Sequence, residues 1–301
     1  MDDALTGKYA VLLMAYGAPA GLDDIPAYLQ SVLGGRPVPD AVVREVTERY
    51  RAIGGRSPLV DITREQARLL AERLGVRVAV GMKHSEPAIC AAGCETLIAL
   101  AMTPYYSKMS VGAYMNELDR VVVALDRPPR VLKIESWHDE PRLVEALAAR
   151  TREALERIPE KLREKTVLLA TAHSLPERVV PPGDPYPEAL KSTAAAVAAA
   201  AGIERWRFAY QSRGGSGKEP WLGPDAGAAI KELAREGIES VVLSPIGYLA
   251  DNLETLYDDD ILYRGIAEEA GVAFARAAAV NTHPRLIELL ADIVRRRLET
   301  G

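Results

Sequence analysis

The sequence predicts an α/β protein of two doubly wound, Rossmann-like domains whose parallel sheets flank a central cleft. Two observations lead to this fold class. Short β-branched runs alternate with amphipathic stretches of about 10–15 residues along the whole chain, which is the pattern of βαβ units and parallel sheets. The chain has 301 residues, which is enough for roughly two domains of ordinary size.

The first half of the chain contains four predicted strands and two predicted helices. The strands are β-branched, largely apolar runs: Lys8–Ala15, Val76–Gly81, Thr96–Thr103 and Arg130–Glu135. Between the first two strands, Asp40–Arg51 and Thr63–Leu74 carry apolar residues at helical spacing. A boundary is expected near Ser136–Pro141, so the first domain is predicted to span residues 1–138.

The second half repeats this alternation. Its predicted strands are Thr166–Ala172, Arg207–Gln211, Ser240–Pro245 and Val272–Ala277. Its predicted helices are Arg142–Ile158, Asp225–Glu236 and Arg285–Leu298. The second domain is therefore expected to span residues 139–282 and to form a parallel sheet of its own.

Composition and charge exclude several classes of protein. Hydrophobic residues make up 48% of the chain and charged residues 26%, a globular composition that excludes a disordered or fibrous protein. The net charge of −5 gives no basic surface for nucleic acid or an anionic membrane. No apolar run reaches the roughly 18 residues of a membrane span. The start Met1–Asp3 is acidic where a secretory signal is basic, so we expect a cytoplasmic protein.

Two cysteines and one glycine-rich segment call for separate interpretations. Cys90 and Cys94 lie four residues apart in a segment predicted to be helical, and we expect both to be small buried hydrophobic residues. Two thiols make neither a disulfide framework nor an iron–sulfur cluster. The segment Gly214–Lys218 lacks the spacing of a nucleotide-binding loop and is predicted to be a flexible loop.

All four histidines fall at predicted strand ends, where ligands bind in open α/β sheets. His283 precedes Pro284, and His138 stands shortly before Pro141, so both are expected to belong to helix starts. For His84, a structural and a functional role remain equally open. His173 follows an apolar strand and lies between two small residues, so we expect its ring to be available for chemistry.

An acidic segment, Asp251–Asp260, follows the seventh predicted strand. If it is helical, Asp251, Glu254 and Asp258 lie on one face of the helix. Acidic residues in a first turn also complement the helix dipole, which would account for Asp251 and Glu254 but not for Asp258. Carboxylates together with imidazole suit ferrous iron, and a histidine opposite a glutamate can act as a base and proton relay.

Ten short segments carry a resemblance that covers nearly the whole chain. They are Leu13–Gly17, Arg49–Leu59, Gly81–His84 with Glu86–Pro87, Pro104–Ser107, Glu135–Pro141, His173–Pro176, Gly183–Pro187, Gln211–Ser212, Trp221–Pro224 and Leu253–Asp258. Each segment alone is weak evidence, but their order and spacing are specific. Taken together, the chain resembles the ferrochelatase family.

This resemblance implies an enzyme that inserts ferrous iron into a porphyrin in haem biosynthesis and releases two protons. It also implies a chelatase-like fold with the macrocycle in the cleft and a C-terminal helix, residues 283–301, that packs back on the first domain. The expected substrates are ferrous iron and a porphyrin, with no tightly bound cofactor. We expect a monomer that binds no nucleic acid and has no membrane span.

The resemblance also assigns roles to individual residues. His173 and Glu254 match the metal-side histidine and glutamate of the family, which face each other, and Tyr16 matches the aromatic residue on the opposite side of the macrocycle. A neutral His173 near its ordinary pKa could take a proton from the porphyrin. Further expected contacts are Arg49, Ser57, Tyr105, Tyr106 and Lys83 for the substrate, and Asp251, Asp258 and His84 as accessory metal sites.

The segments Lys83–Pro87 and Glu135–Pro141 resemble the soluble bacterial branch of the family, which is associated with coproporphyrin III. Three departures from the resemblance concern metal or substrate contacts. Asn252 stands where many relatives have a histidine, and Leu262 stands where soluble bacterial relatives often have an outer acidic residue. Leu33–Gly34 replaces an arginine that some relatives use near a propionate. The alternatives are a protoporphyrin IX ferrochelatase, a porphyrin or haem carrier without turnover, and a chelatase for cobalt or nickel.

Overall fold

The computed structural model describes residues 8–90, 94–214 and 219–300. The chain divides into two compact units. The first unit consists of Met1–Pro104, Met109–Ser136 and Leu286–Gly301, and the second of Tyr105–Lys108 and Trp137–Arg285. The predicted flexible loop at Gly214–Lys218 lies almost entirely outside the described residues.

The first unit is built on a parallel sheet of four strands in the order β2-β1-β3-β4. The strands are β1 (Tyr9–Ala15), β2 (Val78–Met82), β3 (Thr96–Ala101) and β4 (Arg130–Ile134). The helices are η2 (Leu22–Asp24), α1 (Ile25–Val32), α2 (Asp40–Ala52), α3 (Leu59–Leu74), α4 (Val111–Val123) and α10 (Pro284–Thr300). Every residue of β1 is buried, because a central strand of a parallel sheet is covered on both faces.

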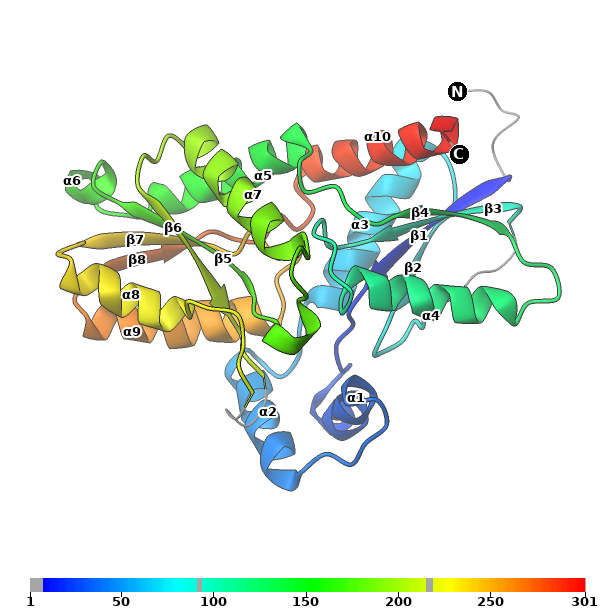
Figure 1. The fold of residues 1–301 in the computed structure, drawn as a ribbon, viewed down its shortest axis with the longest axis horizontal. Helices are drawn as coiled ribbons and strands as arrows, with labels where there is room; N and C mark the ends of the chain where they lie inside the picture. The colour runs from blue at the N-terminus through cyan, green and yellow to red at the C-terminus, as the bar shows by residue number, and fades with distance from the viewer. Residues whose placement is uncertain (1–7, 91–93, 215–218, 301) are drawn as a thin grey trace. The chain divides into compact units, whose positions relative to one another are not determined.

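Helix α10 brings the end of the chain back to the first sheet. Figure 1 shows α10 and α4 on opposite sides of this sheet. The guanidinium of Arg297 donates to the carbonyl of Lys133 in β4 at 3.1 Å, and that of Arg295 donates to the carbonyl of Arg73 in α3 at 3.3 Å. The apolar face of α10, which includes Leu290 and Val294, is buried. The helix therefore belongs to the core of the first unit.

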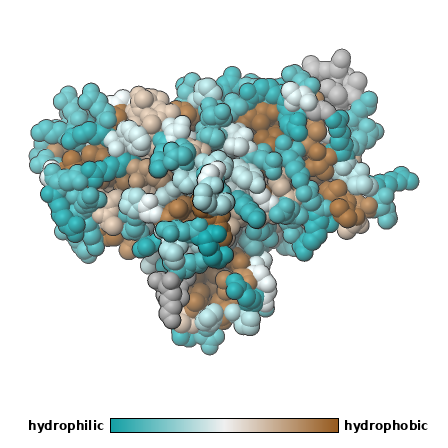
Figure 2. Space-filling model, in the orientation of Figure 1, coloured by the Kyte–Doolittle hydropathy of each residue, from teal (hydrophilic) through white to brown (hydrophobic). Residues whose placement is uncertain are grey.

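Helices α1 and α2 form a pair that extends away from the first sheet (Figure 1). Only Ile25, Leu29 and Tyr50 of the two helices are buried. Figure 2 shows apolar side chains at the surface of this pair, and Val42 in α2 is 37% exposed. Most apolar residues of this helix pair therefore lie outside the core.

The second unit contains a second parallel sheet, in the order β6-β5-β7-β8. Its strands are β5 (Val167–His173), β6 (Trp206–Gln211), β7 (Ser240–Ser244) and β8 (Ala273–Arg276). Its helices are α5 (Pro141–Leu155), α6 (Glu160–Arg163), η3 (Glu177–Val179), α7 (Tyr186–Ala201), α8 (Ala226–Arg235), the π-helix η4 (Thr255–Tyr263) and α9 (Arg264–Glu269). Helices α5 and α7 cover one face of the sheet, and α8 and α9 cover the other (Figure 1).

The core of the second unit fixes where the π-helix lies. Leu169 and Leu243 of the sheet pack against Ile230 of α8 and against Tyr263, the last residue of the π-helix, in one buried cluster. The residues just before this helix lie near the carboxyl ends of β5 and β7. Because ligands bind at such strand ends in parallel sheets, this is the end of the second unit that matters for function.

The predicted fold class is confirmed. All eight predicted strands are present, and each strand end lies within two residues of its expected position. Helix α3 begins at Leu59 rather than Thr63. Its N-cap is Pro58, and the hydroxyl of Ser57 accepts the backbone N–H of Leu59 at 3.3 Å. No helix within the described ranges combines the length and apolar composition needed to cross a bilayer.

The interpretation of the two cysteines was wrong. Cys90 is exposed and Cys94 is half-buried, and neither lies in a helix. The N–H of Met82 donates to the carbonyl of Pro87 at 2.7 Å, and Met82 bridges to Ala88. The chain before Cys90 therefore runs beside the end of β2 instead of forming a helix. The residues between the two cysteines lie outside the described part of the chain.

Candidate functional site

The second unit brings His173 and Glu254 into direct contact. His173 is the last residue of β5, and its Nε2 lies 3.2 Å from Oε1 of Glu254. The other ring nitrogen, Nδ1, faces the backbone carbonyl of Ser174. An Nδ1–H donated to this carbonyl orients the ring so that Nε2 points at the carboxylate. The two side chains are 36% and 32% exposed, so the pair is open to solvent.

The electrostatics of this pair correct one expectation. Burial by itself lowers the pKa of His173, but the charge of Glu254, its hydrogen bond and the Ser174 carbonyl outweigh burial and raise the pKa to about 9. The expectation of a neutral His173 with an ordinary pKa was therefore wrong, because a carboxylate at 3.2 Å favours the imidazolium. At neutral pH the resting pair holds one proton.

The carboxylate of Glu254 has a second contact that sequence reasoning missed. The hydroxyl of Tyr248 donates to Oε2 of Glu254 at 2.6 Å. Tyr248 follows the end of β7, so its position at a strand end was the available signal, but tyrosine in itself does not indicate this role. Each oxygen of the Glu254 carboxylate thus faces a different polar side chain of the second unit.

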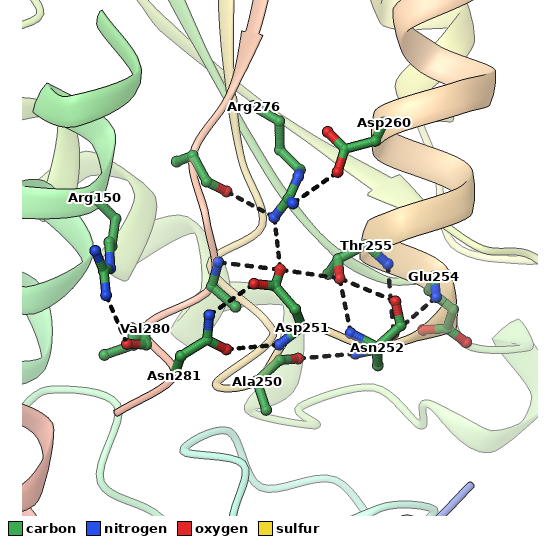
Figure 3. Close-up of polar contacts among 12 residues, drawn as sticks. Arg150, Ala250, Asp251, Asn252, Glu254, Thr255, Asp260, Arg276, Val280 and Asn281 are labelled. Carbon is green, nitrogen blue, oxygen red and sulfur yellow. Dashed lines mark hydrogen bonds and ion pairs between the residues drawn. The ribbon is translucent and has the colours of Figure 1, made fainter. Parts of the chain in front are cut away.

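Asn252 caps the start of the helix in whose first turn Glu254 lies. The side-chain Oδ1 of Asn252 accepts the backbone N–H of Glu254 at 2.8 Å and that of Thr255 at 3.4 Å. In return, the N–H of Asn252 donates to Oγ1 of Thr255 at 2.9 Å (Figure 3). This reciprocal capping satisfies the free N–H groups at the helix start. The residue that replaces a histidine of many relatives has a structural task here.

Asp251 does not belong to an acidic stripe. It precedes the helix, and its carboxylate contacts Nη1 of Arg276 and Nδ2 of Asn281, both at 2.7 Å (Figure 3). The side chain is only 13% exposed. The predicted alignment of Asp251 with Glu254 and Asp258 was wrong, because Asp251 lies outside the helix and residues 255–263 form a π-helix with a different periodicity. Asp251 serves an internal ion pair.

Asp258 is also placed differently from the expectation. It is only 3% exposed, and its Oδ2 accepts a hydrogen bond from the hydroxyl of Ser212 at 2.5 Å. Asp258 is thus a buried residue of the π-helix. Within the described ranges, no group of three or more histidine, cysteine, aspartate or glutamate residues is arranged to hold a metal ion.

The remaining candidates for metal or aromatic contact belong to the first unit. Tyr16 is 41% exposed, and its ring lies 4.7 Å from the ring of His84. Nδ1 of His84 lies 3.0 Å from the hydroxyl of Ser31. Burial, together with the charge of Lys83, lowers the pKa of His84 to about 4. His84 is therefore neutral at physiological pH and is held by a tyrosine and a serine.

The candidate substrate contacts of the first unit have separate environments. Arg49 in α2 forms an ion pair with Glu45 at 2.8 Å and keeps 35% of its side chain exposed. Burial lowers the pKa of Lys83, whose Nζ lies 5.9 Å from the centre of the Tyr114 ring. Ser57 is 6% exposed, and its hydroxyl accepts the N–H of Leu59, the first residue of α3. Arg49 and Lys83 keep accessible charge, whereas the hydroxyl of Ser57 serves the backbone.

Tyr105 and Tyr106 belong to the second unit and differ sharply in exposure. Tyr105 is completely buried, and its hydroxyl donates to the carbonyl of Ile246 at 3.2 Å. The expectation that Tyr105 contacts the substrate was wrong for this reason: its ring packs in an apolar cluster with Tyr186 and Leu190. Tyr106 is half-buried.

Two histidines have the structural positions that were predicted. His283 precedes α10, and its Nδ1 accepts the backbone N–H of Arg285 at 3.2 Å, which confirms its place at a helix start. His138 lies just before α5, and its carbonyl accepts a hydrogen bond from the hydroxyl of Thr193 at 3.3 Å. Both histidines therefore take part in local structure.

The ion pairs of Arg276 lead to a prediction about stability. Arg276 is 9% exposed and joins Asp251 and Asp260, each at 2.7 Å (Figure 3). Replacing it with methionine leaves the largely buried Asp251 without a cation and Asp260 with the exposed Arg264 alone, so we expect the free energy of unfolding to fall by about 3–5 kcal/mol. Urea denaturation measures this loss.

Arg264→Met is the matched control, because Arg264 pairs with the same Asp260 at 3.2 Å but is 41% exposed. An exposed pair contributes about 1 kcal/mol or less. Similar, small losses for both variants would contradict the structural importance of the buried pair.

The chain is similar to known proteins over nearly its whole length. The family model described as Ferrochelatase matches residues 8–298. A coproporphyrin III ferrochelatase of Geobacillus kaustophilus is 39% identical over 302 residues, which cover 95% of each chain. A ferrochelatase of Herpetosiphon aurantiacus is 38% identical over 96% of this chain and 99% of its own. A ferrochelatase of Deinococcus radiodurans is 38% identical over 95% of both chains.

Two solved structures share the fold. CbiX, described as the terminal enzyme for biosynthesis of sirohaem in denitrifying bacteria, matches with a TM-score of 0.54 and 17% identity, over 95% of this chain and 98% of its own. DR2241 of Deinococcus radiodurans, described as a multi-domain protein with structural similarity to chelatases, matches with a TM-score of 0.55 and 15% identity. That match covers 95% of this chain and 54% of DR2241. At these identities the likeness concerns the fold.

Proposed function

The chain belongs to the ferrochelatase family, and from this premise we propose that it inserts ferrous iron into coproporphyrin III and forms iron coproporphyrin. The reaction class, insertion of iron into a porphyrin with loss of two protons in haem biosynthesis, is that of the family. The choice of coproporphyrin III is supported by relatives with that name, which include the one from Geobacillus kaustophilus at 39% identity.

The contact between His173 and Glu254 is the observation that supports this function. A porphyrin must lose two N–H protons, and the entering ferrous ion needs ligands on its way to the ring. Imidazole and carboxylate can supply both a ligand and a base. We propose that His173 and Glu254 together fill these two roles.

The proton held by the resting pair sets the order of events. The pKa of His173 is raised to about 9, so His173 is an imidazolium at neutral pH while Glu254 balances its charge. A histidine must be neutral to bind a metal ion, so the arriving ferrous ion displaces this proton to solvent. The carboxylate of Glu254 can guide the iron. Once the iron has passed from Nε2 of His173 to the ring nitrogens, Nε2 can accept one of the two pyrrole protons and the carboxylate of Glu254 the other.

Residues of the first unit complete the proposal. The half-exposed ring of Tyr16 is suited to contact the apolar macrocycle. Arg49 and Lys83 offer cations to the four carboxylates of coproporphyrin III, and Tyr106 of the second unit is a further candidate contact. We propose His84 as a neutral accessory group beside Tyr16, since its pKa is lowered by burial.

Anaerobic incubation with ferrous iron and each porphyrin in turn tests the function. The visible spectrum is expected to change from that of the free base to that of the iron porphyrin, with higher kcat/KM for coproporphyrin III than for protoporphyrin IX. A preference for protoporphyrin IX would overturn the substrate assignment. Binding of porphyrin without any iron insertion would identify a carrier instead.

We further propose that the enzyme acts as a cytoplasmic monomer without a tightly bound cofactor. In the proposed reaction iron is consumed as a substrate, so the reaction itself requires no resident cofactor. Sedimentation velocity measures the state of association, and a sedimenting species of about 33 kDa, the mass of one 32.6 kDa chain, is expected. Elemental analysis of the purified protein is expected to find no stoichiometric metal.

The proposed role of Arg49 gives a specific prediction. Arg49→Lys is expected to raise the KM for coproporphyrin III, because lysine cannot reproduce the paired hydrogen bonds of a guanidinium to a carboxylate. The KM for a porphyrin without carboxylates is expected to stay unchanged. Steady-state kinetics with both porphyrins measures the difference, and an equal loss with both would mean that Arg49 only supports α2.

A further inference from the structure

Tyr248 lies beside the pair formed by His173 and Glu254, and no role has been assigned to it so far. We propose that Tyr248 is a positioning residue: its hydroxyl holds one oxygen of the Glu254 carboxylate, so that the other oxygen stays turned toward His173. This inference rests on the proposed function of the pair. It concerns a side chain that acts through Glu254 and does not itself touch the iron or the porphyrin.

The geometry divides the two carboxylate oxygens between two partners. The hydroxyl of Tyr248 donates to Oε2 of Glu254 at 2.6 Å. Nε2 of His173 lies 3.2 Å from the other oxygen, Oε1. A glutamate side chain has three rotatable bonds and, at 32% exposure, room to turn toward solvent. A short hydrogen bond to a charged acceptor is among the stronger polar contacts in proteins. Tyr248 therefore restricts the carboxylate to the orientation that reaches His173.

The backbone anchors Tyr248 to the same strand that carries His173. The N–H of Gly247 donates to the carbonyl of Thr171 in β5 at 3.1 Å, and the N–H of Tyr248 donates to the carbonyl of Pro245 at 3.0 Å. A Cβ on Gly247 would come within 2.6 Å of the Cβ of Ala172. Only glycine allows this close approach, so the turn and strand β5 hold Tyr248 and His173 in a fixed relation.

Glu254 is thus held at both of its ends. Its backbone N–H is bound by Oδ1 of Asn252 at 2.8 Å (Figure 3), and its carboxylate is bound by the hydroxyl of Tyr248. The helix cap places the backbone of the residue. The hydroxyl of Tyr248 constrains the carboxylate.

The protonation state of Tyr248 agrees with a donor that does not titrate. Burial raises the pKa of Tyr248 well above its ordinary value, and the charge of Glu254 raises it further. The hydroxyl therefore keeps its proton throughout the physiological range. As a permanent donor it can hold the Glu254 carboxylate.

Tyr248→Phe removes the hydroxyl and keeps the ring. We expect kcat to fall about tenfold, because the carboxylate loses the donor that holds its orientation. The KM for porphyrin is expected to stay within about twofold of the wild-type value, since the proposed role of Tyr248 is to orient Glu254 and not to bind the macrocycle. NMR titration of His173 is expected to give a lower pKa than in the wild type, because the carboxylate is no longer held against the imidazole.

Tyr9→Phe is the matched control. Tyr9 in β1 is buried, and its hydroxyl has no hydrogen-bond partner among the described residues. This variant makes the same chemical change at a site without a functional contact, so kcat and the pH profile are expected to stay as in the wild type. A thermal melt of both variants compares the structural cost of each change.

The double variant with Glu254→Gln separates this inference from the proposed function. If Tyr248 acts through Glu254, adding Tyr248→Phe to Glu254→Gln causes no further loss of turnover. Equal losses in both backgrounds, an unchanged pKa of His173 in Tyr248→Phe, or a melt far below that of Tyr9→Phe would each overturn the positioning role. Near wild-type turnover of Glu254→Gln alone would instead overturn the proposed function of the pair.

Discussion

His173→Ala is expected to lower turnover about 10²–10⁴-fold, the usual effect of removing a positioned acid–base group. The protein is expected to fold, because the His173 side chain is 36% exposed at the end of β5 and contributes little to the core. Porphyrin affinity should change far less, since the ring nitrogen is proposed to act on the iron and on the pyrrole protons. Single-turnover spectroscopy and a porphyrin-binding titration measure the two effects separately.

His283→Ala is the control for this histidine replacement. His283 lies at the start of α10, where its Nδ1 accepts the N–H of Arg285, and it has no place in the proposed reaction. Turnover of this variant is expected to match the wild type. A folded His173→Ala protein with turnover within a few-fold of the wild type would refute the mechanism. A parallel loss of porphyrin binding would make His173 a packing residue.

Glu254→Gln is expected to lower the pKa of His173 from about 9 toward the ordinary value of 6.5, because the charge of Glu254 is the largest influence that raises it. Turnover is expected to fall by about 10²-fold or more, since the pair loses its carboxylate. NMR titration of the imidazole measures the pKa. An unchanged pKa in this variant would show that another group sustains the shift.

The same ion pair sets a pH dependence of stability. Because the pKa of folded His173 lies above 6.5, the pair contributes stability that is fully present below about pH 6.5 and is lost as the pH rises through about 9. Both side chains are about one-third exposed, so water screens the pair and the contribution is small. In the Glu254→Gln variant, the free energy of unfolding is not expected to fall in this way as the pH rises. Urea melts at pH 6, 7.5 and 9 test the difference.

The alternation of strands and helices was predictable from local sequence. Strands such as Tyr9–Ala15 and Ser240–Ser244 are short apolar runs, and burial on both faces of a parallel sheet imposes that pattern directly on the residues. The place of His173 at a strand end was predictable for the same reason. Short-range patterns determine where elements begin and end, because backbone geometry and solvent exposure act on neighbouring residues.

Side-chain partners from distant parts of the chain were not predictable in this way. Asp251 looked like the first member of an acidic stripe, yet it pairs with Arg276, 25 residues away. Tyr105 looked like a substrate contact, yet its hydroxyl reaches the carbonyl of Ile246, 141 residues away. The sequence shows that such residues are polar or aromatic, but only the packing of the sheet and helices selects their partners.

The sequence by itself determined the fold class, the order of the strands along the chain and the two residues of the candidate pair, His173 and Glu254. Tertiary structure decided the chemistry of that pair, because a carboxylate at 3.2 Å raises the pKa of His173 and a tyrosine from the next strand end holds the carboxylate. Both effects depend on distance and burial, because electrostatic and hydrogen-bonding interactions weaken within a few ångströms. They arise only when the ends of β5 and β7 and the start of the π-helix meet in the folded chain.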